Sequence, residues 1–349
     1  MIFIKRNLLV SIILLVLFGQ DAANACSRLL WNNNGSLVMS ARTFDWSYSL
    51  ESMLYINPRG LTMNGGTTEN PAEWTVKYGS VTTAISSWLQ KQGPFTLADG
   101  ATDGINEKGL AAHALFLQNT VFEKLEPSKP ALTSLRWIRY LLDNFATVEE
   151  ALAGMNTVDI VPGKIGNNLM RFHVALEDKS GDTAIIEFIG GKQVIYHGHD
   201  VRVMTNNPPY DAQIKNLEKY KSFGGQKPLP GNVESTDRFV RLSYFSKFLP
   251  ATNNPDTASS YLLSTMRTAA SPYGAPYASG GVYPTWWTSV IDLTNGLYYF
   301  NWTETPNLIK VALPALDFSE NSGTRVLDPR RPDLFGTVNN QFLPVSLND

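Results

Sequence analysis

A single cysteine, Cys26, stands just past a hydrophobic N-terminal run, and Arg42 and Asp45 follow it within two strand lengths. A thiolate is a strong nucleophile, and a neighbouring cation favours the thiolate over the thiol. If Cys26 begins the mature chain, it also has a free α-amine, whose pKa of about 7.7–8.0 makes it a proton acceptor near neutral pH. Asp45 could then orient the ammonium form. These residues predict a nucleophile that needs no partner histidine.

The segment before Cys26 has the three parts of a secretory signal peptide. Lys5 and Arg6 give a positive start, and residues 8–19 form an apolar run of signal-peptide length that is short for a membrane span. Ala23-Asn24-Ala25 is an A-x-A cleavage site. We therefore expect a signal peptide over residues 1–25.

Cleavage between Ala25 and Cys26 would give a periplasmic or secreted protein with one domain over residues 26–349. Two alternatives stay open. The apolar run could remain as an uncleaved membrane anchor, or Cys26 at the +1 position could be acylated, as in bacterial lipoproteins.

The composition limits the classes of partner. One cysteine forms no internal disulfide, so an exported chain must depend on its core, and the roughly 320 residues left after cleavage suffice for that. The net charge of −2 gives no electrostatic reason to expect nucleic acid or an anionic membrane. Eight Trp residues indicate a large core and an aromatic-lined pocket. A small molecule is the expected partner.

Other catalytic motifs are absent from the sequence. There is no G-x-S-x-G, H-E-x-x-H, Walker A or CxxC motif. His197 and His199 alternate at strand spacing, but no acidic pair completes a metal site, so we expect no metal and no cofactor. Cys–His catalysis through His113 or His173 remains an alternative.

The elements that must position Cys26 and Arg42 are expected to be the two strands of a β-hairpin, since an Asn-rich turn ending in Gly35 separates two apolar runs. The strands are expected over residues 26–31 and 36–46. A three-residue loop pairs Cys26 with Arg42, and a two-residue loop pairs it with Thr43. Either register places the guanidinium of Arg42 near the sulfur.

The rest of the chain alternates between strand and helix patterns. Strands are expected in residues 172–198 (three strands), 285–302 (a hairpin turning at Asn295-Gly296) and 308–318. Helices are expected over residues 132–145, 147–155 with Thr147 as N-cap, 237–249 and 256–270. Antiparallel strands and helices in separate runs favour an α+β fold over a doubly wound sheet.

Four ordered segments resemble the choloylglycine hydrolase family of linear amide C–N hydrolases, which includes penicillin V acylases and bile salt hydrolases. They are CSRLLW...ARTFDW in the first hairpin, DGINEKGLAAHALF (103–116), VMTNNPPYDAQI (203–214) and LPGNVESTDRFVR (229–241). The resemblance covers most of the chain after residue 25. It implies an N-terminal nucleophile hydrolase with a four-layer αββα sandwich of antiparallel sheets and no cofactor.

The resemblance also implies roles for individual residues. Cys26 is the nucleophile, and Arg42 and Asp45 match the arginine and aspartate of the first hairpin. Asn206 matches the asparagine that helps to form the oxyanion hole. Arg238 matches the arginine that completes the polar network, and at a helix start we expect it to contact a specific carboxylate or the substrate.

The family's second oxyanion donor and its acyl pocket are harder to assign to residues of this sequence. Other members have Asn or Tyr at the position of Phe116, and a phenyl ring cannot donate, so only the Phe116 backbone N–H could serve. Trp46, Phe116 and Phe122 are expected to form an apolar wall for the acyl group. Trp286 and Trp287 are consecutive and should face opposite sides of a strand.

The implied activity is transfer of an acyl group from an amide to water through a thioester. A penicillin V acylase-type amidase that removes an aromatic or fatty acyl group is the leading expectation. Bile salt hydrolase and N-acyl homoserine lactone acylase activities stay open. An alternative of another class is a lipid-anchored periplasmic binding protein with the same fold. Residues 207–237 are too short for the family's assembly loop, so its tetramer contacts are not expected, although a homo-oligomer stays open.

Overall fold

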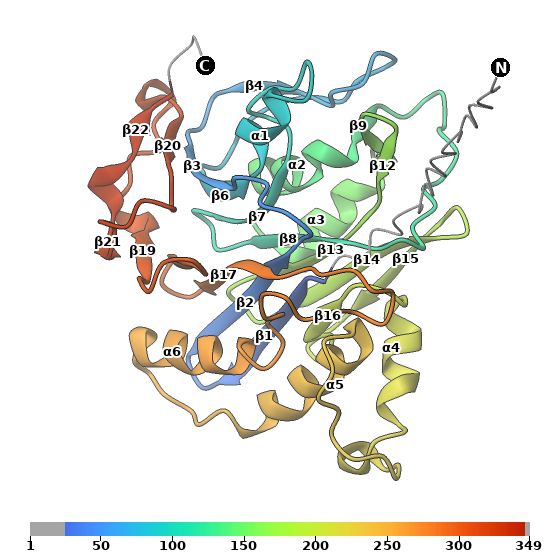
Figure 1. Ribbon diagram of the computed structural model, residues 1–349. Coiled ribbons are helices and arrows are strands. Elements are labelled where there is room, and N and C mark those ends of the chain that lie inside the picture. The colour runs from blue at the N-terminus through green and yellow to red at the C-terminus, as the bar shows by residue number, and fades with distance from the viewer. Residues whose placement is uncertain (1–24, 346–349) are drawn as a thin grey trace, which may run out of the picture.

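The computed structural model describes residues 25–345, with two large β-sheets at its centre (Figure 1). The predicted signal peptide therefore lies almost entirely outside the described residues, and its cleavage stays a prediction. Within the described part, no helix is long and apolar enough to cross a membrane.

The first sheet, sheet A, has seven strands and contains the N-terminal hairpin. In spatial order its strands are β16 (Val203–Thr205), β1 (Ser27–Asn34), β2 (Leu37–Asp45), β17 (Thr285–Asp292), β18 (Leu297–Trp302), β19 (Ile309–Ala312) and β21 (Gly336–Thr337). All neighbours are antiparallel except β19 and β21.

The second sheet, sheet B, has nine strands, and all its neighbouring strands are antiparallel. In spatial order they are β15 (Lys192–His197), β14 (Thr183–Ile189), β13 (Phe172–Glu177), β8 (Ala111–Phe116), β7 (Ala101–Asn106), β6 (Ser80–Ala84), β3 (Met53–Asn57), β20 (Arg325–Leu327) and β22 (Leu343–Pro344). Three short pairs lie outside both sheets: β4 (Thr62–Asn64) with β5 (Glu73–Thr75), β9 (Ala131–Thr133) with β10 (Asp159–Val161), and β11 (Gly163–Ile165) with β12 (Asn168–Met170).

Helices cover the outer face of each sheet (Figure 1). They are α1 (Ser86–Gln90), α2 (Trp137–Asn144), α3 (Val148–Met155), α4 (Tyr210–Leu217), α5 (Ser235–Phe245) and α6 (Pro255–Met266). Short 3-10 turns are η1 (Ser134–Arg136), η2 (Lys221–Phe223), η3 (Ser246–Phe248), η4 (Leu313–Ala315), η5 (Glu320–Ser322) and η6 (Asn339–Gln341). Thr147 caps α3 as predicted, since its side chain accepts a hydrogen bond from the Glu150 N–H.

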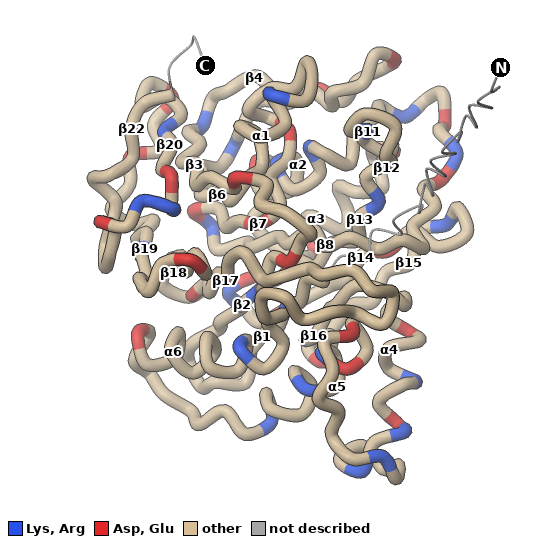
Figure 2. Tube along the Cα trace, viewed as in Figure 1, with Lys and Arg blue, Asp and Glu red and all other residues tan. Residues whose placement is uncertain are grey.

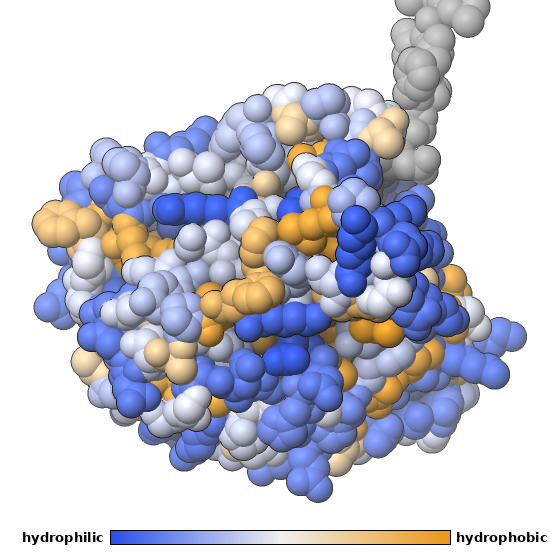
Figure 3. Space-filling model, turned by 90° about the horizontal axis from the view of Figure 1, so that it is seen from below, coloured by the Kyte–Doolittle hydropathy of each residue, from blue (hydrophilic) through white to orange (hydrophobic). Residues whose placement is uncertain are grey.

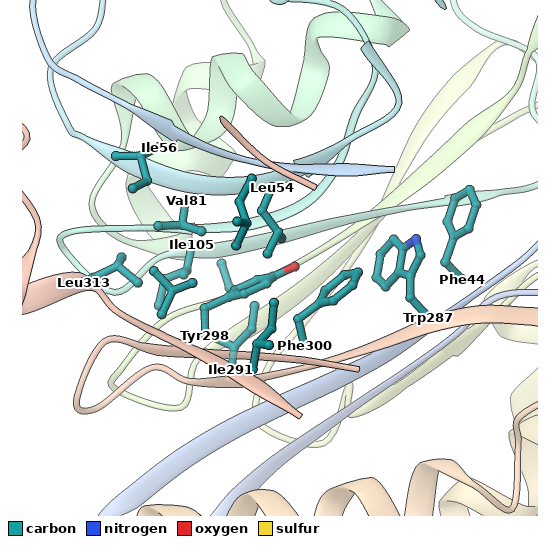
Figure 4. Packing of buried hydrophobic residues seen from close by; sticks show 14 of the residues in the cluster. Phe44, Leu54, Ile56, Val81, Ile105, Trp287, Ile291, Tyr298, Phe300 and Leu313 are labelled. Atoms are coloured by element: carbon teal, nitrogen blue, oxygen red, sulfur yellow. The ribbon is translucent and has the colours of Figure 1, made fainter. Parts of the chain in front are cut away.

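Three apolar layers hold these elements together. Helices α5 and α6 pack on sheet A, and α2 and α3 pack on sheet B. Between the sheets lies a core in which Trp287, Phe300 and Tyr298 of sheet A face Leu54, Val81 and Ile105 of sheet B (Figure 4). The arrangement is the predicted αββα sandwich, and the α+β fold class is confirmed.

The surface has no single dominant charge. Lys and Arg are interspersed with Asp and Glu over the trace (Figure 2), and the face seen from below is mostly hydrophilic, with separate hydrophobic patches (Figure 3).

The register of the first hairpin differs from both predictions. Arg28, not Cys26, is the partner of Arg42, and Ser27 is the partner of Thr43. The turn consists of Gly35, at a φ of 58°, and Ser36, because Asn34 stays in β1 with its side chain buried. The Asn34 Oδ1 accepts a hydrogen bond from the Thr252 N–H at 2.8 Å, and an irregularity between Trp31 and Asn34 absorbs the offset.

Candidate active site

Cys26 lies immediately before the first residue of β1, and its side chain is buried. The Sγ atom is 3.5 Å from Nη2 of Arg42 and 3.9 Å from the carbonyl oxygen of Asp45. Burial raises the pKa of the Cys26 thiol, and the positive charge of Arg42 is the strongest opposing influence. The predicted proximity of guanidinium and sulfur is therefore found, although the register that produces it is different.

Arg42 is held rigidly. Its Nη1 donates to the carbonyl oxygen of Thr102 on β7, and its guanidinium lies 5.5 Å and 5.1 Å from the ring centroids of Phe44 and Trp287. Contacts of this kind stabilise a buried guanidinium through the electron-rich ring faces. One terminal nitrogen of the planar guanidinium binds the opposite sheet while the other contacts the sulfur, an arrangement that the forked shape of arginine allows.

Asp45 ends β2 and is fully buried. Burial raises its pKa to about 7, and the charge of Arg238 is the largest opposing influence. Its Oδ1 accepts a hydrogen bond of 2.5 Å from the hydroxyl of Thr285 on β17, and its Oδ2 accepts one of 3.4 Å from Thr43. A carboxyl with this pKa can exchange its charge state near neutral pH.

Arg238, in the first turn of α5, joins the nucleophile to the next strand. Its Nη1 donates to the Cys26 carbonyl oxygen at 2.6 Å and to the Ser27 hydroxyl, and its Nη2 donates to Oδ1 of Asn206 at 3.2 Å. With the Val233 carbonyl oxygen, these partners take four of the five N–H groups of the guanidinium, and none of them is a carboxylate. The carboxylate contact is therefore not found among the described residues, and the alternative, a contact with the substrate, stays a prediction. Asp45 interacts with Arg238 through charge alone.

Asn206 follows β16 and bridges the two sheets. Its Nδ2 donates to the carbonyl oxygen of Phe116, the last residue of β8, at 2.7 Å. Leu117 donates its N–H to Arg171, on the β13 side. Because N–H directions alternate along a strand, the Phe116 N–H points to the β7 side, beyond the last β7–β8 pair of Asp103 with His113.

The aromatic residues divide into two groups. The rings of Trp46 and Phe116 meet edge to face at 6.4 Å, and Trp286 donates from its indole nitrogen to the Trp46 carbonyl oxygen. Trp287 is buried between the sheets, and the half-buried Trp286 packs against the same inter-sheet core. The expectation that they face opposite sides assumes a regular strand, whereas β17 has an irregularity between Thr285 and Trp287. Phe122 is not brought to this wall, since it packs 5.1 Å from Phe188 in the core beneath α2 and α3.

The histidines of the Cys–His alternative are bonded elsewhere. His113 lies between Asp103 and Glu177, which it contacts through Nδ1 and Nε2. His173 contacts Glu187 at 3.0 Å. Neither histidine is among the hydrogen-bond partners found for the Cys26 sulfur, which are Arg42 and Asp45. Among residues 25–345, no group of three or more His, Cys, Asp or Glu side chains is placed to hold a metal ion.

Sequence reasoning missed a buried ionic network directly behind the site. Arg28 binds Glu177, which binds His113, which binds Asp103, and Asp103 accepts from the Tyr298 hydroxyl. All five side chains are buried between the sheets. The one signal in the sequence is the spacing of Cys26 and Arg28, since residues two apart on a strand share a face.

Known proteins match this chain over most of its length. The family model for linear amide C–N hydrolases, choloylglycine hydrolase family, matches residues 26–326. A penicillin V acylase of Pectobacterium atrosepticum is 34% identical over 93% of this chain and 92% of its own. A bile salt hydrolase/transferase of Bifidobacterium longum subsp. longum is 25% identical over 85% of this chain and 98% of its own.

The solved structure of a penicillin V acylase from Agrobacterium tumefaciens has a TM-score of 0.80 and 34% identity, covering 92% of this chain and 98% of its own. The fold, the buried cysteine with its arginine and aspartate, and these matches all point to the same family. The chain is a linear amide C–N hydrolase and belongs to the choloylglycine hydrolase family.

Proposed function

We propose that this hydrolase is a penicillin V acylase-type amidase whose nucleophile is the thiol of an N-terminal Cys26. The observation that carries the proposal is the position of Sγ, 3.5 Å from a fixed guanidinium, at the end of a hydrogen-bonded chain through Arg238 and Asn206 to Phe116. The relatives named penicillin V acylase, at 34% identity, favour the same class of substrate.

The proposal requires that Ala25 be removed. While Ala25 is attached, the Cys26 nitrogen belongs to a peptide bond and has no basic lone pair. Cleavage between Ala25 and Cys26 creates an α-amine next to the thiol, and that amine removes the thiol proton. The burial that raises the thiol pKa is then less of an obstacle, because the thiol need not ionise unaided.

The reaction follows in two stages. Sγ adds to the amide carbonyl carbon, and the developing oxyanion accepts hydrogen bonds from Nδ2 of Asn206 and the N–H of Phe116. The C–N bond then breaks as the α-ammonium gives its proton to the leaving nitrogen, which leaves a thioester on Cys26. Water, deprotonated by the α-amine, attacks the thioester, and the acid departs as the thiol is restored. Arg42 stabilises negative charge on sulfur, and Asp45 orients the α-amine.

The acyl group is proposed to lie against Trp46 and the ring of Phe116. Two aromatic rings that meet edge to face offer an apolar wall for a phenoxyacetyl group or a fatty acyl chain. Phe122 has no part in this wall, because it packs in a different core.

Substrate competition tests the proposal. We expect the mature enzyme to hydrolyse penicillin V faster than a long-chain N-acyl homoserine lactone or a glycine-conjugated bile acid at equal concentration. A preference for the bile acid would overturn the substrate class. The Cys26→Ala variant should fold and lose turnover, and full activity in that variant would end the mechanism.

The intact mass of the exported protein, measured before and after thiol alkylation, tests the state of Cys26. A mass that starts at Cys26 and gains one alkyl group supports the free nucleophile. A mass increased by a diacylglycerol and an acyl chain, without alkylation, would replace the enzyme by a lipid-anchored binding protein.

A further inference from the structure

Ala25, the residue just before the nucleophile, fills a pocket of its own. It is 0% exposed and packs with Tyr277 and Tyr283, which are 6% and 7% exposed, and with the half-buried Val233. This cluster is separate from the three main cores. Residues of two surface segments, Val233 and the two tyrosines, therefore enclose the residue on the N-terminal side of Cys26.

The wall of the pocket is built by the segment that leads into β17. Tyr277 donates its N–H to the Gly281 carbonyl oxygen at 2.8 Å, and its hydroxyl lies 2.6 Å from that of Ser271. The two tyrosine rings meet edge to face at 5.2 Å. Gly281 lies against this packing, since a Cβ there would lie 2.3 Å from the Tyr283 hydroxyl and would displace that ring.

The pocket borders the catalytic groups directly. The carbonyl oxygen of Val233 accepts a hydrogen bond of 2.9 Å from Nε of Arg238, whose other nitrogens bind the Cys26 carbonyl and Asn206. Glu234, next to Val233, accepts the N–H of Ala278 at 2.7 Å and ties the segment to the start of α5. Loss of Ala25 would therefore open an apolar space beside both the α-amine and the guanidinium.

Proton transfer decides which part of the substrate enters this space. The α-amine of Cys26 must deliver its proton to the leaving nitrogen, so that nitrogen has to lie on the α-amine side of the sulfur, where Ala25 was attached. We propose that the pocket of Ala25 is the subsite for the leaving amine, and that it takes amines whose first atoms beyond nitrogen are apolar and uncharged. This inference rests on the proposed function, because it requires Cys26 to act from the N-terminus.

One cation and two carboxyl groups border the pocket. Arg238 acts on Tyr277 as a positive charge, and Asp45 and Glu234 oppose it, so an anion close to the leaving nitrogen would lie beside two acidic side chains. Arg238 already donates four of its five N–H groups to protein oxygens, so it cannot offer a carboxylate the paired contact of an open guanidinium fork. A leaving glycine, whose carboxylate is two bonds from its nitrogen, fits poorly, whereas a small ring or a methyl group fits.

Phenoxyacetyl amides with different amines test the subsite, because they keep the acyl group constant. With the mature enzyme, we expect kcat/KM for the glycinamide to exceed that for the glycine compound, which differs only by its charge, about 10-fold or more. The methylamide should exceed the benzylamide by about 10-fold or more. Tyr283→Ala should raise the benzylamide-to-methylamide ratio by about 10-fold, since it widens the pocket.

Two further variants guard against a misfolded Tyr283→Ala. Val233→Leu narrows the pocket and should lower the same ratio, the opposite sign. Trp46→Ala should change the preference between phenoxyacetyl and acetyl groups without changing the amine ratio. Equal amine ratios in the wild type, Tyr283→Ala and Val233→Leu would overturn the subsite. Hydrolysis of penicillin V but of none of these amides would also overturn the subsite, whereas failure to hydrolyse penicillin V itself would refute the proposed function.

Discussion

Substitution of Arg42 by Gln removes the cation that contacts the nucleophilic sulfur while keeping a polar side chain of similar length. The guanidinium nitrogen lies 3.5 Å from Sγ. At an effective dielectric constant of about 20, a unit charge at that distance stabilises a thiolate by about 5 kcal/mol. Water that enters the vacated space recovers part of this energy. We therefore expect the reaction of Cys26 with iodoacetamide at pH 7 to slow by about 100- to 1000-fold.

Alkylation of the mature protein, followed by mass spectrometry from pH 6 to pH 10, measures the effect without any substrate. Cys26 is the one cysteine of the chain, so the signal reports a single thiol. Arg42→Lys keeps the charge but loses the fork that binds Thr102 and sulfur together, and should give an intermediate rate.

Arg28→Gln is the matched control for this prediction. Arg28 is the cross-strand partner of Arg42, is equally buried, and binds Glu177 instead of the sulfur. It should lower stability and change the alkylation rate less than about 10-fold. The reasoning is refuted if Arg42→Gln reacts at the wild-type rate across this pH range, or if Arg28→Gln slows the reaction as much.

Three other variants test the remaining parts of the site. Asn206→Ala removes one oxyanion donor and should lower kcat by about 100- to 1000-fold with little change in KM, and a loss below about 10-fold in steady-state assays would exclude that role. Burial disfavours the His113 imidazolium, but Glu177 and Asp103 outweigh it and raise the pKa of His113 to about 9. The stabilisation of the fold by protonated His113 is full below pH 6.5 and is lost as pH rises through 9. In urea titrations, the unfolding free energy of the wild type minus that of His113→Gln should therefore fall by about 3 kcal/mol between pH 6 and pH 10. A difference that stays constant over this range would contradict the charge assigned to His113. Trp46→Ala should raise KM for phenoxyacetyl amides at least about 10-fold more than for acetyl amides, and equal changes would remove Trp46 from the acyl wall.

The elements that the sequence predicts well are those with local signals. The Asn295-Gly296 turn, the Thr147 cap and the alternating runs of residues 172–198 all appear in the structure. The hairpin register was predicted wrongly because a distant residue decides it: Asn34 is drawn into β1 by the Thr252 N–H. No local pattern contains that contact.

The candidate site divides along the same line. Cys26, Arg42 and Asp45 lie on one hairpin, so short-range spacing was enough to group them. The partners from the other sheet were not predictable, because Thr102 and Asp103 approach Arg42 only when the sandwich closes. Phe122 was expected beside Phe116 because the two are close in sequence, but the chain turns after β8 and Phe122 packs in the core beneath α2 and α3.

The pairing of Arg28 with Arg42 has a consequence for how the molecule assembles. Two like charges directly opposite each other on neighbouring strands repel, and sheet A alone supplies Arg28 with no carboxylate partner. Glu177 and Asp103 belong to sheet B, so we expect the N-terminal hairpin to become stable only when the two sheets dock. We expect a half-folded chain, or a fragment ending before residue 101, to lack the carboxylates that balance Arg28 and Arg42. The catalytic arrangement around Cys26 would then form in one cooperative step, when the sheets dock at the end of folding.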